Sequence, residues 1–105
     1  MHLSRNSKGV VYIAYNKAMP KLVKIGVSQN CHKIRVKNLN SQSVPFPFEI
    51  LAAFETEKSL EFEQYVHHNL NKYWCAKEFF KLGKADAVHN VQILASTFQH
   101  KAVQL

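Results

Sequence analysis

The chain has few cysteines and no long apolar run. Its two cysteines, Cys31 and Cys75, are too few for a secreted disulfide framework, and neither stands in a Cys-x-x-Cys or zinc-finger spacing. We expect both to be reduced residues of the core or of a helix. Charged residues or histidines interrupt every apolar segment before it reaches the roughly 18 residues of a membrane span. The first residues also lack the apolar core of a signal peptide, so we expect a cytoplasmic protein with no membrane partner.

Glycine and proline are also scarce, with three residues of each among 105. This scarcity, together with a hydrophobic fraction of 47%, excludes a collagen-like or disordered chain. A chain this short fills one hydrophobic core. The sequence therefore predicts a single domain over residues 1–105, with a motif-bearing core over residues 9–82 and a C-terminal helix over residues 86–99.

Acidic residues are absent from the first 48 residues. Eight lysines and arginines give this half a net charge of +8, whereas residues 49–105 contain six lysines and seven acids. Such a basic segment is typical of a protein that binds nucleic acid or an anionic membrane surface. Lysines that only keep a small protein soluble give the same count. Charge alone does not separate these two interpretations.

Hydrophobic patterning predicts an α+β fold. Residues 9–15 and 22–27 are rich in β-branched residues and flank a polar loop, which predicts an antiparallel hairpin, and residues 48–54 predict a third strand. Helices are expected over residues 31–40, from a cap at Thr56 to about Asn71, and from a cap at Asp86. Residues 78–82 read as a short strand or extended piece. We therefore expect a small antiparallel three-stranded sheet, with room for a short extra strand, flanked by helices.

The expected helix over residues 31–40 places an arginine on its apolar face. Arg35 falls near the middle of that arc, whereas Lys33 and Lys37 lie on the opposite face. The guanidinium could pair with a carboxylate or extend to the helix edge. It could also be held beside the sheet as a phosphate ligand, since its planar fork of donors suits that role.

The expected helix after Thr56 has a stripe that combines polar and apolar residues. Its members at spacings of three and four are Leu60, Glu63, His67, Leu70 and Trp74. Glu63 and His67 are therefore one turn apart. They could form a helical pair worth about 0.2–0.5 kcal/mol. Alternatively, Glu63 binds a divalent cation, while His67 or the adjacent His68 contacts substrate or transfers a proton.

Five short motifs occur in a fixed order along the chain. They are G-V-V-Y-I from Gly9, V-K-I-G from Val23, Arg35, E-x-x-V-H from Glu63 and E-F-F from Glu78. In this order and spacing the chain resembles the GIY-YIG nuclease superfamily. The resemblance is strongest to its short, phage-associated branch described as a DNA-binding domain.

The resemblance implies a phosphodiesterase site on one face of a small antiparallel sheet, with one Mg²⁺ or Mn²⁺ ion. Tyr12 matches the tyrosine near the attacking water, Arg35 the arginine on the scissile phosphate, and Glu63 the metal ligand. Gly9 and Gly26 match the motif glycines. Strand alternation places Tyr12 and Ala14 on the same face. We therefore expect Tyr12, Arg35 and Glu63 to point at one sheet face.

The chain departs from the family pattern at three places. Lys24 replaces the tyrosine of the second motif and could instead neutralise phosphate. Val27 stands where several family members have a lysine, and the late asparagine has no clear match, since Asn69 and Asn71 are only nearby. These departures bear on cleavage more than on DNA binding.

Three functions remain open from the sequence. The first is a metal-dependent DNA endonuclease with Tyr12, Lys24, Arg35 and His67 as catalytic residues. The second is a DNA-binding module of the same fold without turnover. The third is a protein-interaction domain that docks through Phe46, Phe48, Phe79 and Phe80, although core and loop packing is the preferred explanation of these rings. In the first two, the DNA backbone would contact Lys17, Lys21, Lys33 and Lys37, and target choice would need a homodimer or another subunit.

Overall fold

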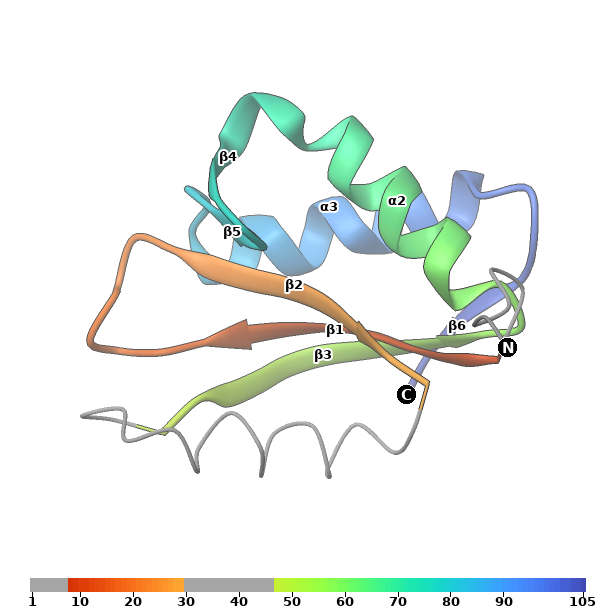
Figure 1. The fold of residues 1–105 in the computed structure, drawn as a ribbon, viewed down its shortest axis with the longest axis horizontal. Helices are drawn as coiled ribbons and strands as arrows, with labels where there is room; N and C mark the ends of the chain where they lie inside the picture. Colours follow the sequence, from red (N-terminus) through yellow and green to blue (C-terminus); the bar gives the residue numbers. More distant parts are fainter. Residues whose placement is uncertain (1–7, 30–46) are drawn as a thin grey trace.

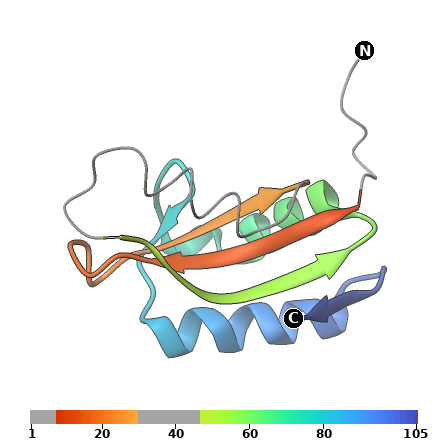
Figure 2. The same cartoon turned by 90° about the horizontal axis from the view of Figure 1, so that it is seen from below.

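The computed structural model describes residues 8–29 and 47–105. In these ranges the chain forms a six-stranded antiparallel sheet with two α-helices on one face (Figures 1 and 2). The strand order is β4-β5-β2-β1-β3-β6. The strands are β1 (Gly9–Tyr15), β2 (Val23–Ser28), β3 (Glu49–Thr56), β4 (Trp74–Ala76), β5 (Phe79–Phe80) and β6 (Ala102–Gln104). The helices are α2 (Ser59–Asn69), the 3₁₀ turn η1 (Asn71–Tyr73) and α3 (Lys84–Thr97).

The predicted hairpin forms the centre of the sheet. Strands β1 and β2 pair antiparallel, with Tyr12 directly opposite Gly26. Asn16 begins the connecting turn: its side-chain oxygen accepts a hydrogen bond from the Ala18 amide, and its carbonyl accepts one from the Met19 amide. This turn chemistry is typical of asparagine. The α+β class and the hairpin are thus confirmed.

The main core lies between the sheet and the two helices. Alternate residues of the hairpin, including Val11, Ile13 and Ile25, face this layer and are fully buried. Phe62 of α2 and Val91 of α3 pack against them. Burying each such side chain stabilises the fold by about 1.5–3 kcal/mol. This packing fixes α2 across the hairpin.

A second, smaller cluster covers the opposite face of the sheet. It consists of Val10, Tyr12, Ala14 and Ala53, with Phe48 and Ile50 packed against it. Since Tyr12 pairs with Gly26, and side chains alternate along a strand, Gly26 and Lys24 also belong to this face. Tyr12 and α2 therefore lie on opposite faces of the sheet.

The prediction of three strands is wrong, because the sheet has six. The three additional strands, β4, β5 and β6, contain only two or three residues each. Such segments are too short to show an alternating pattern, and their pairing depends on tertiary contacts. Only β5 falls within an extended piece that the sequence predicted.

Two predicted helix starts are also corrected. The N-cap of α2 is Lys58, and Thr56 instead accepts a hydrogen bond from the Lys58 amide in the preceding turn. The N-cap of α3 is Gly83, which leaves Asp86 inside the first turn. A negative charge there still favours the helix, since the helix N-terminus is partly positive.

The predicted stripe on the second helix is too long. Helix α2 ends at Asn69 and Leu70 is its C-cap, so Trp74 belongs to β4 and does not follow His67 on a helix. Cys75 is exposed in the same strand, which contradicts its assignment to the core or a helix. The predicted helix over residues 31–40, with Cys31, lies outside the described residues. No helix in the described ranges is long and apolar enough to cross a membrane.

Candidate active site at the edge of strand β2

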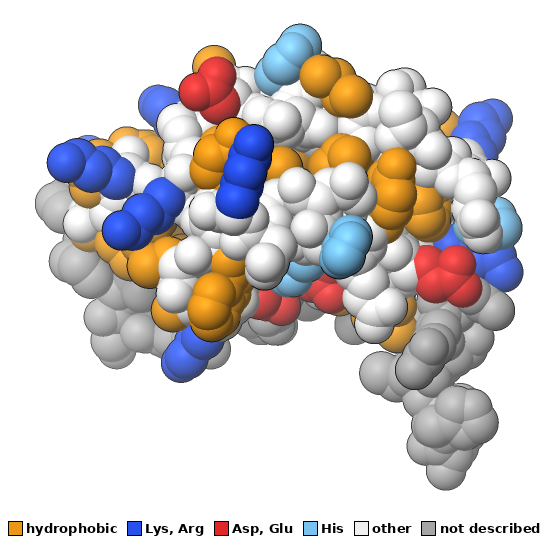
Figure 3. Space-filling model, turned by 90° about the horizontal axis from the view of Figure 1, so that it is seen from above, with side chains coloured by type: hydrophobic (Ala, Val, Ile, Leu, Met, Phe, Trp, Pro, Cys, Tyr) orange, Lys and Arg blue, Asp and Glu red, His pale blue; other side chains and the backbone are white. Residues whose placement is uncertain are grey.

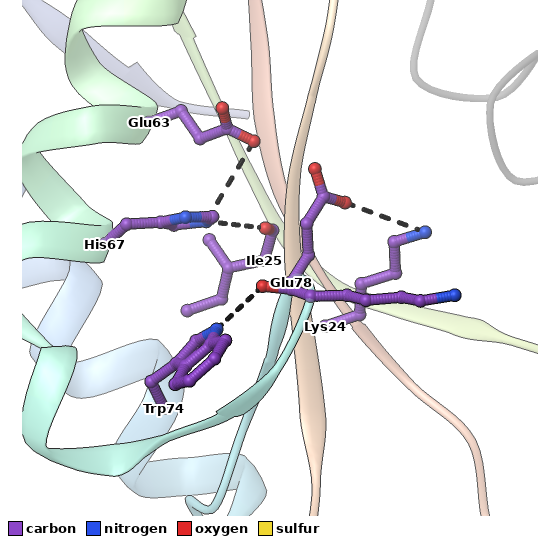
Figure 4. A network of polar contacts seen from close by, with 7 residues as sticks. Lys24, Ile25, Glu63, His67, Trp74 and Glu78 are labelled. Carbon is purple, nitrogen blue, oxygen red and sulfur yellow. Dashed lines mark hydrogen bonds and ion pairs between the residues drawn. The ribbon is translucent and has the colours of Figure 1, made fainter.

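Several charged and polar side chains meet along the outer edge of β2. They are Lys24, Glu63, His67 and Glu78. Strand β5 pairs with β2 only at Val23 and Lys24. At the next position, the Ile25 amide donates to the Glu78 carbonyl (3.0 Å), and the Ile25 carbonyl accepts from Nε2 of His67 (2.9 Å). Figure 4 shows Glu63 and His67 on one side of this edge and Lys24 on the other. The edge is thus closed by side chains of α2 and by the segment before β5.

Gly26 leaves space for two polar groups. A Cβ atom at Gly26 would lie 2.7 Å from the Tyr12 hydroxyl oxygen and 3.0 Å from Oε1 of Glu78. The phenol and the carboxylate therefore converge on one point above the strand. A side chain at Gly26 would therefore force the phenol or the carboxylate to shift. Moving the Tyr12 ring would disturb its close packing, because the ring is fully buried.

Lys24 supplies the positive charge beside this point. Its Nζ lies 3.7 Å from Oε1 of Glu78, and only 13% of the Lys24 side chain is exposed. The ammonium group and the Tyr12 hydroxyl thus both approach the Glu78 carboxylate from the face opposite α2. The Lys24 ammonium group partly neutralises the charge of the Glu78 carboxylate.

Glu63 reaches the same carboxylate from α2. Its Oε2 atom is buried, has no hydrogen-bond partner among the described residues, and lies 3.9 Å from Nε2 of His67. Burial, the negative charge of Glu78 and a hydrogen bond with Glu78 together raise the pKa of Glu63 from 4.5 to about 7. Two carboxyl groups held this close favour one shared proton or one cation between them.

His67 connects α2 to the sheet edge. Because the Ile25 carbonyl can only accept, Nε2 of His67 must donate the hydrogen bond, which leaves Nδ1 as the acceptor in the neutral ring. The ring also packs edge-on against Phe80, with centroids 5.0 Å apart. These contacts fix the helix turn that presents Glu63.

The structure brings together five of the predicted site residues: Tyr12, Lys24, Gly26, Glu63 and His67. The sequence led us to expect Tyr12 and Glu63 on one sheet face together with Arg35, and the structure does not place Tyr12 and Glu63 on the same face. Tyr12 and Lys24 lie on the face opposite α2, whereas Glu63 comes from α2 and meets Glu78 at the edge of β2. The edge rather than a sheet face is therefore the centre of the candidate site.

Other predicted residues lie away from this centre or outside the description. Gly9 permits close approach elsewhere, since a Cβ there would lie 2.7 Å from the Ser28 carbonyl oxygen. Lys17 and Lys21 are exposed in the turn between β1 and β2. Arg35, Lys33 and Lys37 lie outside the described residues, so their roles stay predictions.

Glu78 is a residue of this site that the sequence patterns do not assign to it. In the sequence it is only the first residue of the E-F-F motif. A usable signal was nevertheless present, because Glu78 is the only carboxylate between Glu63 and Asp86. The positive φ of Lys77 (52°) turns the chain immediately before Glu78 and directs it toward β2. That turn could not be predicted from local composition.

The carboxylate pair fits a hard divalent cation. Among residues 8–29 and 47–105, no group of three or more His, Cys, Asp or Glu side chains is arranged to hold a metal ion. Magnesium, however, commonly keeps several waters and binds one or two carboxylates together with substrate phosphates. Glu63 and Glu78 supply two carboxylates, and the buried Oε2 of Glu63 is an oxygen ligand without a hydrogen-bond partner in the described ranges.

Fold and site together define a small α+β domain whose polar residues converge at one sheet edge. The T5orf172 domain matches residues 9–95, and the chain belongs to this phage-associated family. The matched region contains the site from Tyr12 to Glu78. No curated protein and no solved structure gives a significant match. Family membership points to a nucleic-acid-related role.

Proposed function

We propose that the chain is a divalent-metal-dependent endonuclease that hydrolyses DNA phosphodiester bonds. The observation that carries this proposal is the Glu63–Glu78 carboxylate pair: burial, and then the neighbouring Glu78, raise the pKa of Glu63, and its buried Oε2 has no hydrogen-bond partner in the described part of the chain. Such a pair gains most from a bound cation. The resemblance to GIY-YIG nucleases and the family match over residues 9–95 support the same chemistry.

Glu63 and Glu78 would hold one Mg²⁺ or Mn²⁺ ion in this proposal. When bound, the ion supplies Lewis-acid stabilisation of charge on the phosphate and on the leaving oxygen. Lys24, whose ammonium group lies 3.7 Å from the Glu78 carboxylate, would neutralise charge on the phosphate from the face opposite α2. Arg35 would bind the scissile phosphate, as the motif resemblance implies.

Tyr12 would orient the attacking water. Its hydroxyl meets Glu78 above Gly26, where the missing Cβ leaves room for polar groups. A water held between the phenol and a carboxylate has one donor and one acceptor to fix its direction. His67 would keep Glu63 in place through its hydrogen bond to the Ile25 carbonyl. These roles use groups from both sheet faces and from the β2 edge.

DNA binding without cleavage is the second candidate function. The specific observation in its favour is the Lys24–Glu78 contact, in which the lysine already offers Glu78 a cationic partner. An internal cation of this kind competes with a metal ion for the carboxylate. The basic surface would still bind the DNA backbone.

The test is a cleavage assay with purified protein on plasmid, single-stranded and branched DNA in Mg²⁺ or Mn²⁺. We expect cleavage in the wild type and a loss of at least about 100-fold in Glu63→Gln and Glu78→Gln, as for other groups that stabilise transition-state charge. Tyr12→Phe should also lose activity. Glu61→Gln and Tyr15→Phe are matched controls from the same helix and the same strand.

Each outcome separates the candidates. Metal-dependent cleavage that survives Glu63→Gln would place the activity in another site or in a contaminant and would overturn the proposal. Salt-sensitive binding with no cleavage under any condition would select the second candidate. Absence of salt-sensitive binding to every nucleic acid would exclude both.

A further inference from the structure

Trp74 is the single tryptophan of the chain, and 54% of it is exposed. Large aromatic side chains usually bury most of their surface, because exposure forfeits their hydrophobic stabilisation. Trp74 begins β4, the outermost strand at one edge of the sheet. Core packing therefore does not explain the position of this indole.

The ring of Trp74 is held in a fixed orientation. Its Nε1 donates a hydrogen bond to the Lys77 carbonyl (2.8 Å), so the polar atom of the indole is already satisfied. Lys77 has a φ of 52°, which costs a non-glycine residue of order 1 kcal/mol or more. The Tyr73 carbonyl accepts from the Lys81 amide (2.7 Å), and the buried Phe80 anchors the partner strand. The hairpin is therefore a rigid support for an exposed aromatic face.

The surface around the indole is basic. Lys72, Lys77 and Lys81 are exposed on the same short segment. Figure 3 shows lysines gathered at the end of the molecule where this hairpin lies, with apolar side chains between them. Alternating positive charge and an aromatic ring is the surface chemistry that binds single-stranded nucleic acid, since phosphates meet lysine and a base stacks on the ring.

The hairpin is continuous with the candidate active site. The Lys77 carbonyl that accepts from Trp74 immediately precedes Glu78, whose carboxylate pairs with Lys24 and acts on Glu63. Figure 4 draws Trp74 in the same network as these residues. The indole is thus connected to the carboxylate pair through two consecutive residues, Lys77 and Glu78.

We infer that the β4–β5 hairpin, residues 74–80, is a stacking platform for an unpaired base, with Trp74 as the ring and the neighbouring lysines as phosphate contacts. The inference rests on the proposed function, because it assumes that nucleic acid is the ligand. Bases inside an intact duplex are already stacked and enclosed. The hairpin therefore selects single-stranded DNA, or DNA with a locally unpaired stretch, over blunt duplex.

Intrinsic fluorescence tests this directly, since every emitted tryptophan signal comes from Trp74. We expect a thymidine oligomer of about 12 nucleotides, within the span that one small binding fold covers, to quench Trp74 emission on binding. A blunt duplex of equal length should quench it much less at equal saturation, as followed by fluorescence anisotropy of a dye on the DNA. Equal quenching by both at saturation would overturn the inference.

Two substitutions separate stacking from apolar contact. Trp74→Leu should weaken binding of the thymidine oligomer by roughly 5- to 100-fold, the loss expected when one base loses its aromatic partner. Trp74→Phe keeps a stacking ring and should lose clearly less. Ile93→Ala removes an exposed apolar residue from α3 and should leave the affinity unchanged. Equal losses in the leucine and phenylalanine variants would contradict a stacking role.

Failure of this inference differs from failure of the proposed function. If DNA binds with strong salt dependence and Trp74→Leu changes neither affinity nor duplex preference, the platform is wrong and the nuclease proposal stands. If the thymidine oligomer and the duplex both fail to bind at low salt, the proposed function fails, and the inference fails with it. A melting curve for each variant confirms that the fold is retained.

Discussion

The carboxyl groups of Glu63 and Glu78 meet at the edge of β2, where burial, followed by the charge of Glu78 and a hydrogen bond with it, raises the pKa of Glu63 to about 7. Glu63 comes from α2, on one side of the sheet, and Glu78 from the turn before β5. On the other face, Tyr12 and Lys24 approach the same carboxylate of Glu78. Four polar side chains, from β1, β2, α2 and the turn before β5, are thus concentrated around one backbone segment.

Stability should fall as the pH rises toward neutrality. The pKa of Glu63 is about 7 in the folded chain against an ordinary 4.5, so the folded state keeps its proton over that range and the unfolded state does not. The stabilising contribution is complete below pH 4.5 and is lost as the pH passes 7. Glu63→Gln should therefore be more stable than wild type at pH 8, by up to about 3 kcal/mol.

Urea unfolding at pH 5 and pH 8 measures this difference. Glu61→Gln, on the same helix but paired with His100 at the surface, should follow the wild-type profile. A Glu63→Gln variant whose stability relative to wild type is the same at both pH values would show that Glu63 is already ionised at pH 5. The shared proton with Glu78 would then be ruled out.

Gly26→Ala should destabilise the fold and displace Tyr12. The new methyl group would lie 2.7 Å from the Tyr12 hydroxyl and 2.9 Å from its Cζ atom. Overpacking of this kind costs about 1–3 kcal/mol. Tyr12→Leu removes both of these contacting atoms. The double variant should therefore lose less unfolding free energy than the sum of the losses in the two single variants.

Gly83→Ala is the matched control for this substitution. A Cβ at Gly83 would meet only Asp86, at an ordinary 3.8 Å, so unfolding free energy should change by less than about 1 kcal/mol. Additive losses for Gly26→Ala and Tyr12→Leu in chemical unfolding would mean that the phenol does not occupy the space above Gly26.

His67 should act through position rather than through its own proton. Glutamine can place an amide donor near the position of Nε2, whereas asparagine is too short to reach the Ile25 carbonyl. We expect His67→Gln to keep most DNA cleavage and His67→Asn to lose roughly 10- to 100-fold, as supporting residues around metal ligands do. Neither variant should change the shape of the pH profile of cleavage. A profile that loses one titration in both variants would assign His67 a role in proton transfer.

Residue patterns predicted the elements with strong local signals. The β-branched run from Gly9 to Tyr15, the turn at Asn16 and the apolar spacing of α2 and α3 all appear close to the predicted positions. These features depend on neighbours within a few residues. The short strands β4, β5 and β6 depend instead on pairing with distant segments, and the sequence could not specify them.

The site was predicted only in part, because its arrangement also depends on contacts between distant segments. The motif order identified Tyr12, Lys24, Gly26, Glu63 and His67, which the structure places around β2. Their arrangement across two faces was missed, because alternation along β1 says nothing about a helix side chain at a sheet edge. Glu78 was missed because its position depends on the turn at Lys77 and on the Ile25 amide. Neither contact has a local sequence signature.

Direct binding of Mn²⁺ tests the central claim that Glu63 and Glu78 form a cation site. Calorimetric titration at pH 8, where Glu63 of the folded chain is ionised, should show one ion bound by the wild type and by Glu61→Gln. Glu63→Gln and Glu78→Gln should each weaken that binding at least tenfold, since each removes an oxygen ligand and a negative charge. Unchanged Mn²⁺ affinity in both of these variants would contradict the claim.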